Sequence, residues 1–126
     1  MAWHTGAVRI LIAPDKFAGT LSALEAAQAI ADGWHRTDPS ARTELLPLSD
    51  GGPGFVEVLH TALGGKVHQT EVTGPLGAPV TAEYLLHGDT AYVESAQACG
   101  LHLVPADERD PGRTTSRGVG ELVSHA

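Results

Sequence analysis

The chain has 126 residues, of which 42% are hydrophobic and 18% are charged, and its formal net charge is −7. A chain of this length suits one small domain that buries about two-thirds of its unfolded surface. The negative charge disfavours nucleic acids and anionic membranes as partners, because phosphate groups require basic patches. No apolar run approaches the roughly 18 residues of a membrane-spanning helix, and the single cysteine, Cys99, favours the cytosol.

The first half of the chain alternates between predicted strands and helices. A β-branched run over residues 8–13 predicts a buried parallel strand, and residues 43–48 predict a second one. The capping box of Ser22 and Glu25 predicts a helix over residues 21–36. Its expected apolar stripe comprises Leu21, Leu24, Ala27, Ile30, Ala31 and Trp34. This order of elements implies a right-handed crossover, so the two strands should be adjacent and parallel.

A second helix should have Pro53 in its first turn and end at Gly64-Gly65. We expect its buried face to contain Phe55, Leu59, Ala62 and Leu63.

The pattern changes after Gly65. Residues 66–73, 80–86 and 90–94 alternate between polar and apolar side chains and are separated by tight turns, which predicts an antiparallel meander. A helical turn over 95–99, a charged loop over 105–112 and a helix over 115–125 should follow. The sequence therefore predicts an α/β protein that starts as a Rossmann-like parallel α/β domain over residues 1–65. Residues 66–126 would begin a second α/β domain, and the open sheet edges indicate an incomplete fold.

Polar loops follow both predicted parallel strands. The first loop contains Asp15, Lys16 and Thr20, and the second contains Asp50, Gly51 and Gly52. Loops at the carboxyl ends of parallel strands meet at one edge of the sheet, where open α/β folds bind ligands. Neither loop matches the P-loop or the dinucleotide-binding glycine pattern. The sequence therefore predicts a small-molecule site of another kind.

Each candidate residue has a structural alternative. Lys16 and the neighbouring backbone could hold a carboxylate or phosphate, or Asp15 and Thr20 could merely close the turn. Asp50 could bind Mg²⁺ or accept a proton from a substrate hydroxyl, or it could cap the second helix. Glu94, at the end of a predicted strand, is either a cap or a ligand contact.

Residues 113–120 gather hydroxyl groups, two arginines and two glycines at the predicted start of the last helix. Thr115 and Ser116 suit an anion there, although a capped helix start without a ligand is the alternative. Gly118 and Gly120 each cost a helix roughly 1 kcal/mol relative to alanine, and their presence in its first turns indicates a close backbone approach.

Five segments, taken in order, resemble the sequence signature of the type-1 glycerate kinases. They are residues 12–23, Asp50-Gly51-Gly52, residues 72–77, Glu94 with Gly100-Leu101, and residues 114–122. The resemblance extends from about Val8 to Val123. Each segment is short, but five of them in the same order are specific.

The resemblance implies the N-terminal portion of an ATP-dependent, Mg²⁺-dependent kinase that phosphorylates D-glycerate, commonly at the 2-hydroxyl. Such enzymes have two α/β domains around a cleft, of which the first is completed by the C-terminal part and the second is inserted. Lys16 and Asp50 would be catalytic, and Asp50 would also bind the metal. The residues expected to contact substrate are Asp15, Thr20, Gly51, Gly52, Glu94, Thr115 and Ser116. The expected partners are D-glycerate and either the missing C-terminal part or a second copy of the chain.

Three positions depart from the family pattern. Ala18 stands where the family usually has lysine, and Pro53 and Phe55 stand where it usually has glutamate and threonine. The alternative interpretation is therefore a non-catalytic ligand-binding or interaction module derived from that family.

Overall fold

The chain forms two compact units, Met1–Asp50 and Gly51–Ala126, and the computed structural model describes residues 8–126. The first unit contains a parallel two-stranded sheet, and the second contains an antiparallel three-stranded sheet. Both units also contain helices, so the predicted α/β class is confirmed. The predicted domain boundary at Gly65 concerns the complete protein and stays a prediction.

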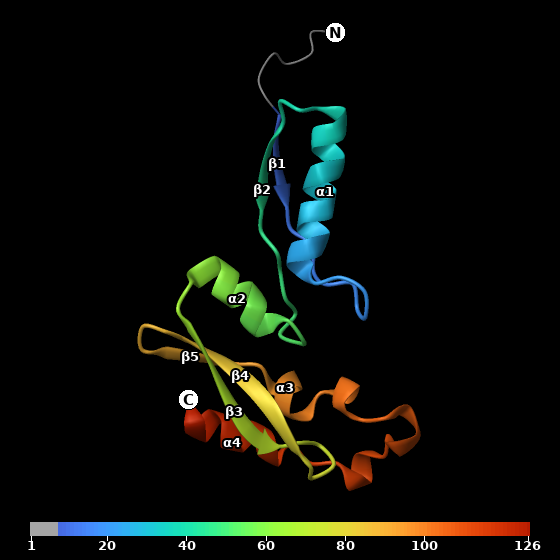
Figure 1. The fold of residues 1–126 in the computed structure, drawn as a ribbon, viewed down its shortest axis with the longest axis vertical. Helices are drawn as coiled ribbons and strands as arrows, with labels where there is room; N and C mark the ends of the chain where they lie inside the picture. The colour runs from blue at the N-terminus through green and yellow to red at the C-terminus, as the bar shows by residue number, and fades with distance from the viewer. Residues whose placement is uncertain (1–7) are drawn as a thin grey trace. The chain divides into compact units, whose positions relative to one another are not determined.

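The first unit consists of β1 (Arg9–Ile12), α1 (Ala23–Thr37) and β2 (Arg42–Leu45) (Figure 1). The two strands are parallel neighbours, with Arg9 opposite Arg42 and Ile12 opposite Leu45, as the crossover rule predicts. The capping box is present: the Ser22 hydroxyl accepts from the Glu25 N–H at 3.2 Å, and the Ser22 N–H donates to the Glu25 carboxylate at 2.8 Å.

The apolar stripe predicted for α1 is only partly buried. Ala27 and Ala31 pack against Ile12 and form the core of the first unit. Leu24, Ile30 and Trp34 remain substantially exposed. Apolar residues occupy a wide arc of α1, and a sheet of two strands covers only the centre of that arc.

The second unit is built around a meander. Its strands are β3 (Lys66–Thr73), β4 (Pro79–His87) and β5 (Thr90–Val93), which pair antiparallel in the order β3-β4-β5. Its helices are α2 (Phe55–Leu63), α3 (Ser95–Cys99) and α4 (Arg117–His125), with three short 3₁₀ turns between α3 and α4 (Figure 1). The predicted meander and the helical turn over 95–99 are confirmed. Gly88 provides the positive φ of +57° that the tight β4–β5 turn requires.

Helices cover both faces of this sheet. Ala98 of α3 and Leu122 of α4 pack with Val72, Ala82 and Tyr84 to form the core of the second unit. The Tyr84 hydroxyl also donates to the His125 carbonyl at 3.0 Å, at the end of α4. Leu85, next to Tyr84 on β4, faces the other side and is fully buried, and α2 lies on that side (Figure 1).

The prediction for α2 was wrong in two respects. The helix begins at Phe55 with Gly54 as its N-cap, so Pro53 precedes its first turn and Asp50 does not cap it. Its buried residues are Val56 and Val58, whereas Leu63 is exposed. Apolar side chains surround this short helix on most sides, so periodicity alone does not select the face that packs on the sheet.

α4 approaches β3 very closely at Gly118. A β-carbon built on Gly118 would overlap the carbonyl group of Thr73, the last residue of β3. A β-carbon on Gly120 would meet nothing within 4 Å. The close approach expected from these glycines therefore holds for Gly118, where the neighbour is the protein's own backbone.

We predict opposite effects for alanine at these two glycines. Gly118→Ala should destabilise the second unit by about 1–3 kcal/mol, because the new methyl group forces α4 away from β3. Gly120→Ala, the matched control, should be neutral or stabilising by up to about 1 kcal/mol. Both tyrosines of the chain, Tyr84 and Tyr92, lie in the second unit, and both tryptophans, Trp3 and Trp34, lie in the first. With both tryptophans replaced by phenylalanine, urea unfolding followed by tyrosine fluorescence measures the second unit selectively. Equal destabilisation by both substitutions would contradict the close contact.

Candidate functional site

The first cluster of candidate site residues, Asp15, Lys16 and Asp50, lies in the loops that follow β1 and β2 at one edge of the parallel sheet. Hydrogen bonding continues beyond the strands, from the Leu46 N–H to the Ile12 carbonyl and from the Leu48 N–H to the Pro14 carbonyl. The next residues along the two segments are Asp15 and Ser49, so the acidic loops emerge side by side. The parallel pairing thus brings the loop with Asp15 next to the loop with Asp50, as the sequence predicts.

Lys16 joins the two loops. Its ammonium nitrogen lies 3.1 Å from Oδ1 of Asp50 and 3.8 Å from Oδ1 of Asp15. The lysine side chain is mostly buried, with 23% exposed, whereas the Asp50 side chain is 67% exposed. Because the ammonium is held in place and the Asp50 carboxylate reaches solvent, this cluster can present both charges to a bound ligand.

Thr20 closes a turn in the first loop. Its hydroxyl donates to the Phe17 carbonyl at 3.0 Å, and its N–H donates to the same carbonyl at 2.9 Å. Gly19 supplies the φ of +77° that this turn needs. The structure therefore gives Thr20 the turn-closing role that was one of its two alternatives, and its exposed hydroxyl oxygen can still accept a hydrogen bond.

Gly51 and Gly52 lead into α2. Gly51 has a φ of +89°, which favours glycine, and the Gly52 carbonyl accepts from the Phe55 N–H at 3.1 Å. This turn places backbone, without side chains, directly after the Asp50 carboxylate. A ligand at Asp50 could therefore approach the main chain closely.

Glu94 lies at the start of α3 and is almost fully buried, with 2% exposed. One carboxylate oxygen accepts from the Val56 N–H, in the first turn of α2, at 3.2 Å. A carboxylate at this position satisfies an N–H group that has no partner within the helix and interacts favourably with the helix dipole. The geometry thus gives Glu94 a capping role, at the helix that follows the Asp50 loop.

Thr115 and Ser116 precede α4 and have different surroundings. The Thr115 N–H donates to the Pro75 carbonyl at 3.0 Å, and the Thr115 hydroxyl accepts from the Arg117 N–H at 3.1 Å. The bond to Arg117 closes a tight turn, whereas the bond to Pro75 ties Thr115 to the turn that follows β3, and α4 begins after them at Arg117 rather than at 115. Ser116 is the N-cap residue, but its exposed side chain makes no capping hydrogen bond among the described residues.

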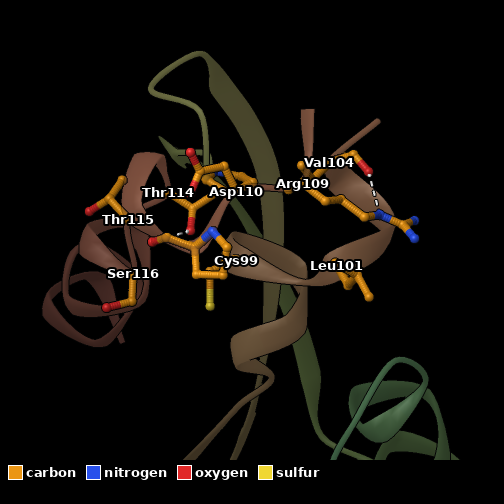
Figure 2. A pocket seen from close by; sticks show the side chains of 10 residues that line it. Cys99, Leu101, Val104, Arg109, Asp110, Thr114, Thr115 and Ser116 are labelled. Atoms are coloured by element: carbon orange, nitrogen blue, oxygen red, sulfur yellow. Dashed lines mark hydrogen bonds between the residues drawn. The ribbon is translucent and has the colours of Figure 1, made fainter. Parts of the chain in front are cut away.

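These residues border a cavity of about 450 Å³ within the second unit. Figure 2 shows Thr114, Thr115 and Ser116 together on one side of it, with Leu101 and Val104 on the other. Cys99, Pro75, Pro111, Arg109 and Asp110 complete the lining. Three of the five sequence segments described above, those containing Pro75, Leu101 and Thr114–Ser116, therefore meet here, and the other two meet at Lys16.

Glu121 fastens α4 to β3. Its carboxylate accepts from the N–H and the hydroxyl of Thr73 at 2.7 and 3.0 Å, and from Nε of Arg117 at 2.7 Å. The two hydrogen bonds from Thr73, assisted by Arg117, hold the pKa of Glu121 below its ordinary value of 4.5.

Sequence reasoning missed the contributions of Cys99, Asp110 and Glu121. Asp110 and Cys99 are separated by eleven positions, and no local pattern indicates that they line one cavity. The only available signal was that residues 105–112 have the charged composition of a loop. Within residues 8–126, no three histidine, cysteine or acidic side chains gather as a metal site does, and no helix has the length and apolarity that a membrane span needs.

The fold and these segments place the chain in a known class. The sequence model of the glycerate kinase family matches residues 10–126, and the chain belongs to this family. It is 50% identical to a glycerate kinase of Bacillus subtilis over 121 residues and 48% identical to a glycerate 2-kinase of Escherichia coli over 121 residues. Each match covers 94% of this chain and 32% of the relative.

A solved structure supports the same assignment. The crystal structure of a putative glycerate kinase 2 from Salmonella typhimurium superimposes with a TM-score of 0.75 and 49% identity. The match covers 95% of this chain and 33% of that one. The chain thus spans about a third of the length of the relatives that it matches.

We predict that Glu94 acts mainly by capping α2. Glu94→Ala should destabilise the second unit by about 1–3 kcal/mol, because the Val56 N–H loses its partner in a buried place. Glu94→Gln retains an oxygen acceptor and should cost less. Tyrosine-monitored urea unfolding measures both, with Glu71→Ala, an exposed glutamate on β3, as the control. A Glu94→Ala variant as stable as this control would contradict the capping role.

We predict a pH-dependent contribution from Glu121. Because its pKa is lowered on folding, the group stabilises the fold fully above about pH 4.5, and this stabilisation is lost as pH falls through the lowered pKa. The stability difference between the native chain and Glu121→Gln should therefore be largest above pH 4.5 and shrink on acidification. Urea midpoints at a series of pH values measure it, with Glu57→Gln as the control for the loss of one charge. A difference that grows on acidification would contradict this sign.

Proposed function

We propose that this chain supplies the N-terminal third of an ATP-dependent glycerate kinase. The reaction transfers the γ-phosphoryl group of ATP to the 2-hydroxyl of D-glycerate, with Mg²⁺, in the cytoplasm. The observation that carries the proposal is the Lys16 ammonium held between the Asp15 and Asp50 carboxylates, at the edge where a parallel sheet binds ligands. Membership of the glycerate kinase family supports the choice of substrate.

The cluster suits the chemistry of phosphoryl transfer. Such reactions need little covalent chemistry from the protein, which mainly positions the reactants and neutralises developing charge. The Lys16 ammonium would bind the glycerate carboxylate or the transferred phosphoryl group. Asp50, with its exposed carboxylate, would orient the glycerate hydroxyl and accept its proton as the new O–P bond forms.

The residues present fit Mg²⁺ that arrives with the nucleotide. Proteins commonly hold Mg²⁺ through one or two carboxylates, with waters and substrate phosphates completing its octahedron. Asp15 and Asp50 provide two carboxylates within reach of one ammonium, and both are partly exposed. Asp50, assisted by Asp15, would hold the ion, which would neutralise phosphate charge when bound.

The remaining predicted residues would assist from the loops. The main chain at Gly51 and Gly52 could approach the substrate closely, and Thr20 offers a hydroxyl oxygen. Glu94 would act on the substrate through α2, whose first turn it caps, rather than by touching the ligand.

A non-catalytic binding module is the second candidate. Ala18 favours it, because the loop lacks a positive charge where the family usually has lysine. Such a module would bind D-glycerate without transferring phosphate.

A chimaera distinguishes the two candidates. Residues 1–126 would be fused to the part of the Bacillus subtilis glycerate kinase that follows its matched segment, and assayed with ATP, Mg²⁺ and D-glycerate. The proposed kinase yields phosphoglycerate, whereas the non-catalytic module yields none although the chimaera is folded. The chain by itself should be inactive, because an open two-stranded sheet leaves the reactants poorly positioned, and misplacement by about 1 Å can cost a hundredfold in rate.

In the active chimaera, we predict that Asp50→Asn lowers kcat by about a hundredfold or more, because the proton acceptor and the charge on the metal are lost. Folding should be unchanged, since Asp50 is exposed and does not cap α2. Asp89→Asn, an exposed aspartate in the β4–β5 turn, is the matched control and should retain full activity. Near-normal turnover of Asp50→Asn would remove Asp50 from the proposed mechanism.

A further inference from the structure

The cavity of the second unit has a chemistry that glycerate does not match. Its volume is about 450 Å³, within the range of sites that bind drug-sized molecules. One wall is apolar and contains Leu101 and Val104, and Cys99, Pro75 and Pro111 add further apolar surface to the lining. Glycerate has three carbons, each bearing oxygen, so it would leave this apolar wall uncovered and most of the volume unfilled.

We propose that this cavity takes the base and ribose of an adenine nucleotide. The proposal rests on the proposed function, which requires a nucleotide, and it assigns the nucleoside to the second unit. A purine ring is flat and largely apolar on its faces, so the Leu101–Val104 wall suits it. Burying that apolar surface provides the favourable free energy of binding.

The polar side chains of the cavity suit the hydrogen-bonding groups of a nucleoside. Oδ1 of Asp110 accepts from the Gly112 N–H at 2.9 Å, and a carboxylate has about four acceptor sites, so Asp110 can also accept from an exocyclic amine or ribose hydroxyls. Ser116 and Thr115 provide hydroxyl groups on the opposite side of the apolar wall (Figure 2).

The positive charge of the lining lies apart from these hydroxyls. Arg109 donates through Nε to the Val104 carbonyl at 3.3 Å, and Figure 2 shows its guanidinium beside Leu101 and Val104, away from Thr115 and Ser116. The hydroxyl-bearing side is therefore not a dedicated anion site with an arginine at its centre. Neutral donors and acceptors facing an apolar wall are what a nucleoside needs.

Cys99 provides a direct measure of occupancy. It is the only cysteine of the chain, it lines the cavity and it is partly exposed. Alkylation of its thiol by iodoacetamide, followed by mass spectrometry, therefore reports on this one place. A ligand that fills the cavity slows the reaction by the factor 1 + [L]/Kd, or about elevenfold at ten times Kd.

The experiment measures alkylation of the purified 126-residue chain with several ligands. ATP, ADP and adenosine should each slow the reaction about tenfold or more at saturation, whereas D-glycerate and inorganic triphosphate should leave it unchanged. Protection by triphosphate but not by adenosine would identify an anion site and overturn the proposal. Protection by D-glycerate would overturn it as well, because glycerate would then be the occupant.

Two matched variants separate the cavity from effects elsewhere. Leu101 and Val123 are both exposed, at 63% and 58%, but only Leu101 lines the cavity. Leu101→Asp puts a charge against the ring and should abolish protection by adenosine, whereas Val123→Asp should retain it. Equal protection in both variants would show that the nucleoside binds elsewhere.

Failure of this inference can be told from failure of the proposed function. If calorimetry detects ATP binding while Cys99 reacts at its original rate, the nucleotide lies outside this cavity and only the inference fails. An inactive, folded chimaera that shows no ATP binding would refute both.

Discussion

The second unit depends on the contact between α4 and the end of β3. Gly118 lets the helix backbone meet the Thr73 carbonyl, and Glu121 then receives both hydrogen bonds that Thr73 donates. Leu122, next along the helix, completes the core. With α4 fixed in this way, the turn at Thr115 comes close enough to bond to Pro75, and one wall of the cavity is formed. Because Gly118 has no β-carbon, α4 can lie against β3, and this position of α4 places Thr115 and Ser116 at the cavity.

The first unit is controlled by strand direction. Two parallel strands joined through a helix must release their following loops at the same edge, and the register carries this pairing on to Pro14 and Leu48. Two carboxylates brought together in this way repel one another unless a cation lies between them. Lys16 provides that cation, which makes the loop pair compatible with folding and at the same time suited to an anionic ligand.

The elements whose signal is local could be predicted from the sequence. The capping box at Ser22, the meander over residues 66–94 and the Gly64 cap depend on neighbouring residues, and the meeting of Asp15 with Asp50 follows from a topological rule. The buried face of α2, the exposure of Trp34 and the identity of the helix that Glu94 caps could not be predicted, because each depends on an element distant in the sequence. The Cys99 cavity requires the positions of three separate segments, which no periodicity encodes.

The two sheets impose very different demands on the order in which the chain folds. In the meander, His87 pairs with Thr90 and Thr73 pairs with Pro79, so each strand finds its partner after closing a short loop. In the parallel sheet, Arg9 pairs with Arg42, and all of α1 lies between these two residues in the sequence. Closing a loop costs conformational entropy before the contacts between its ends can form, and this cost grows with loop length. Pairings between residues close in the sequence therefore form sooner. The segment that leaves the ribosome first therefore acquires its native pairing slowly, while the later segment can already be compact.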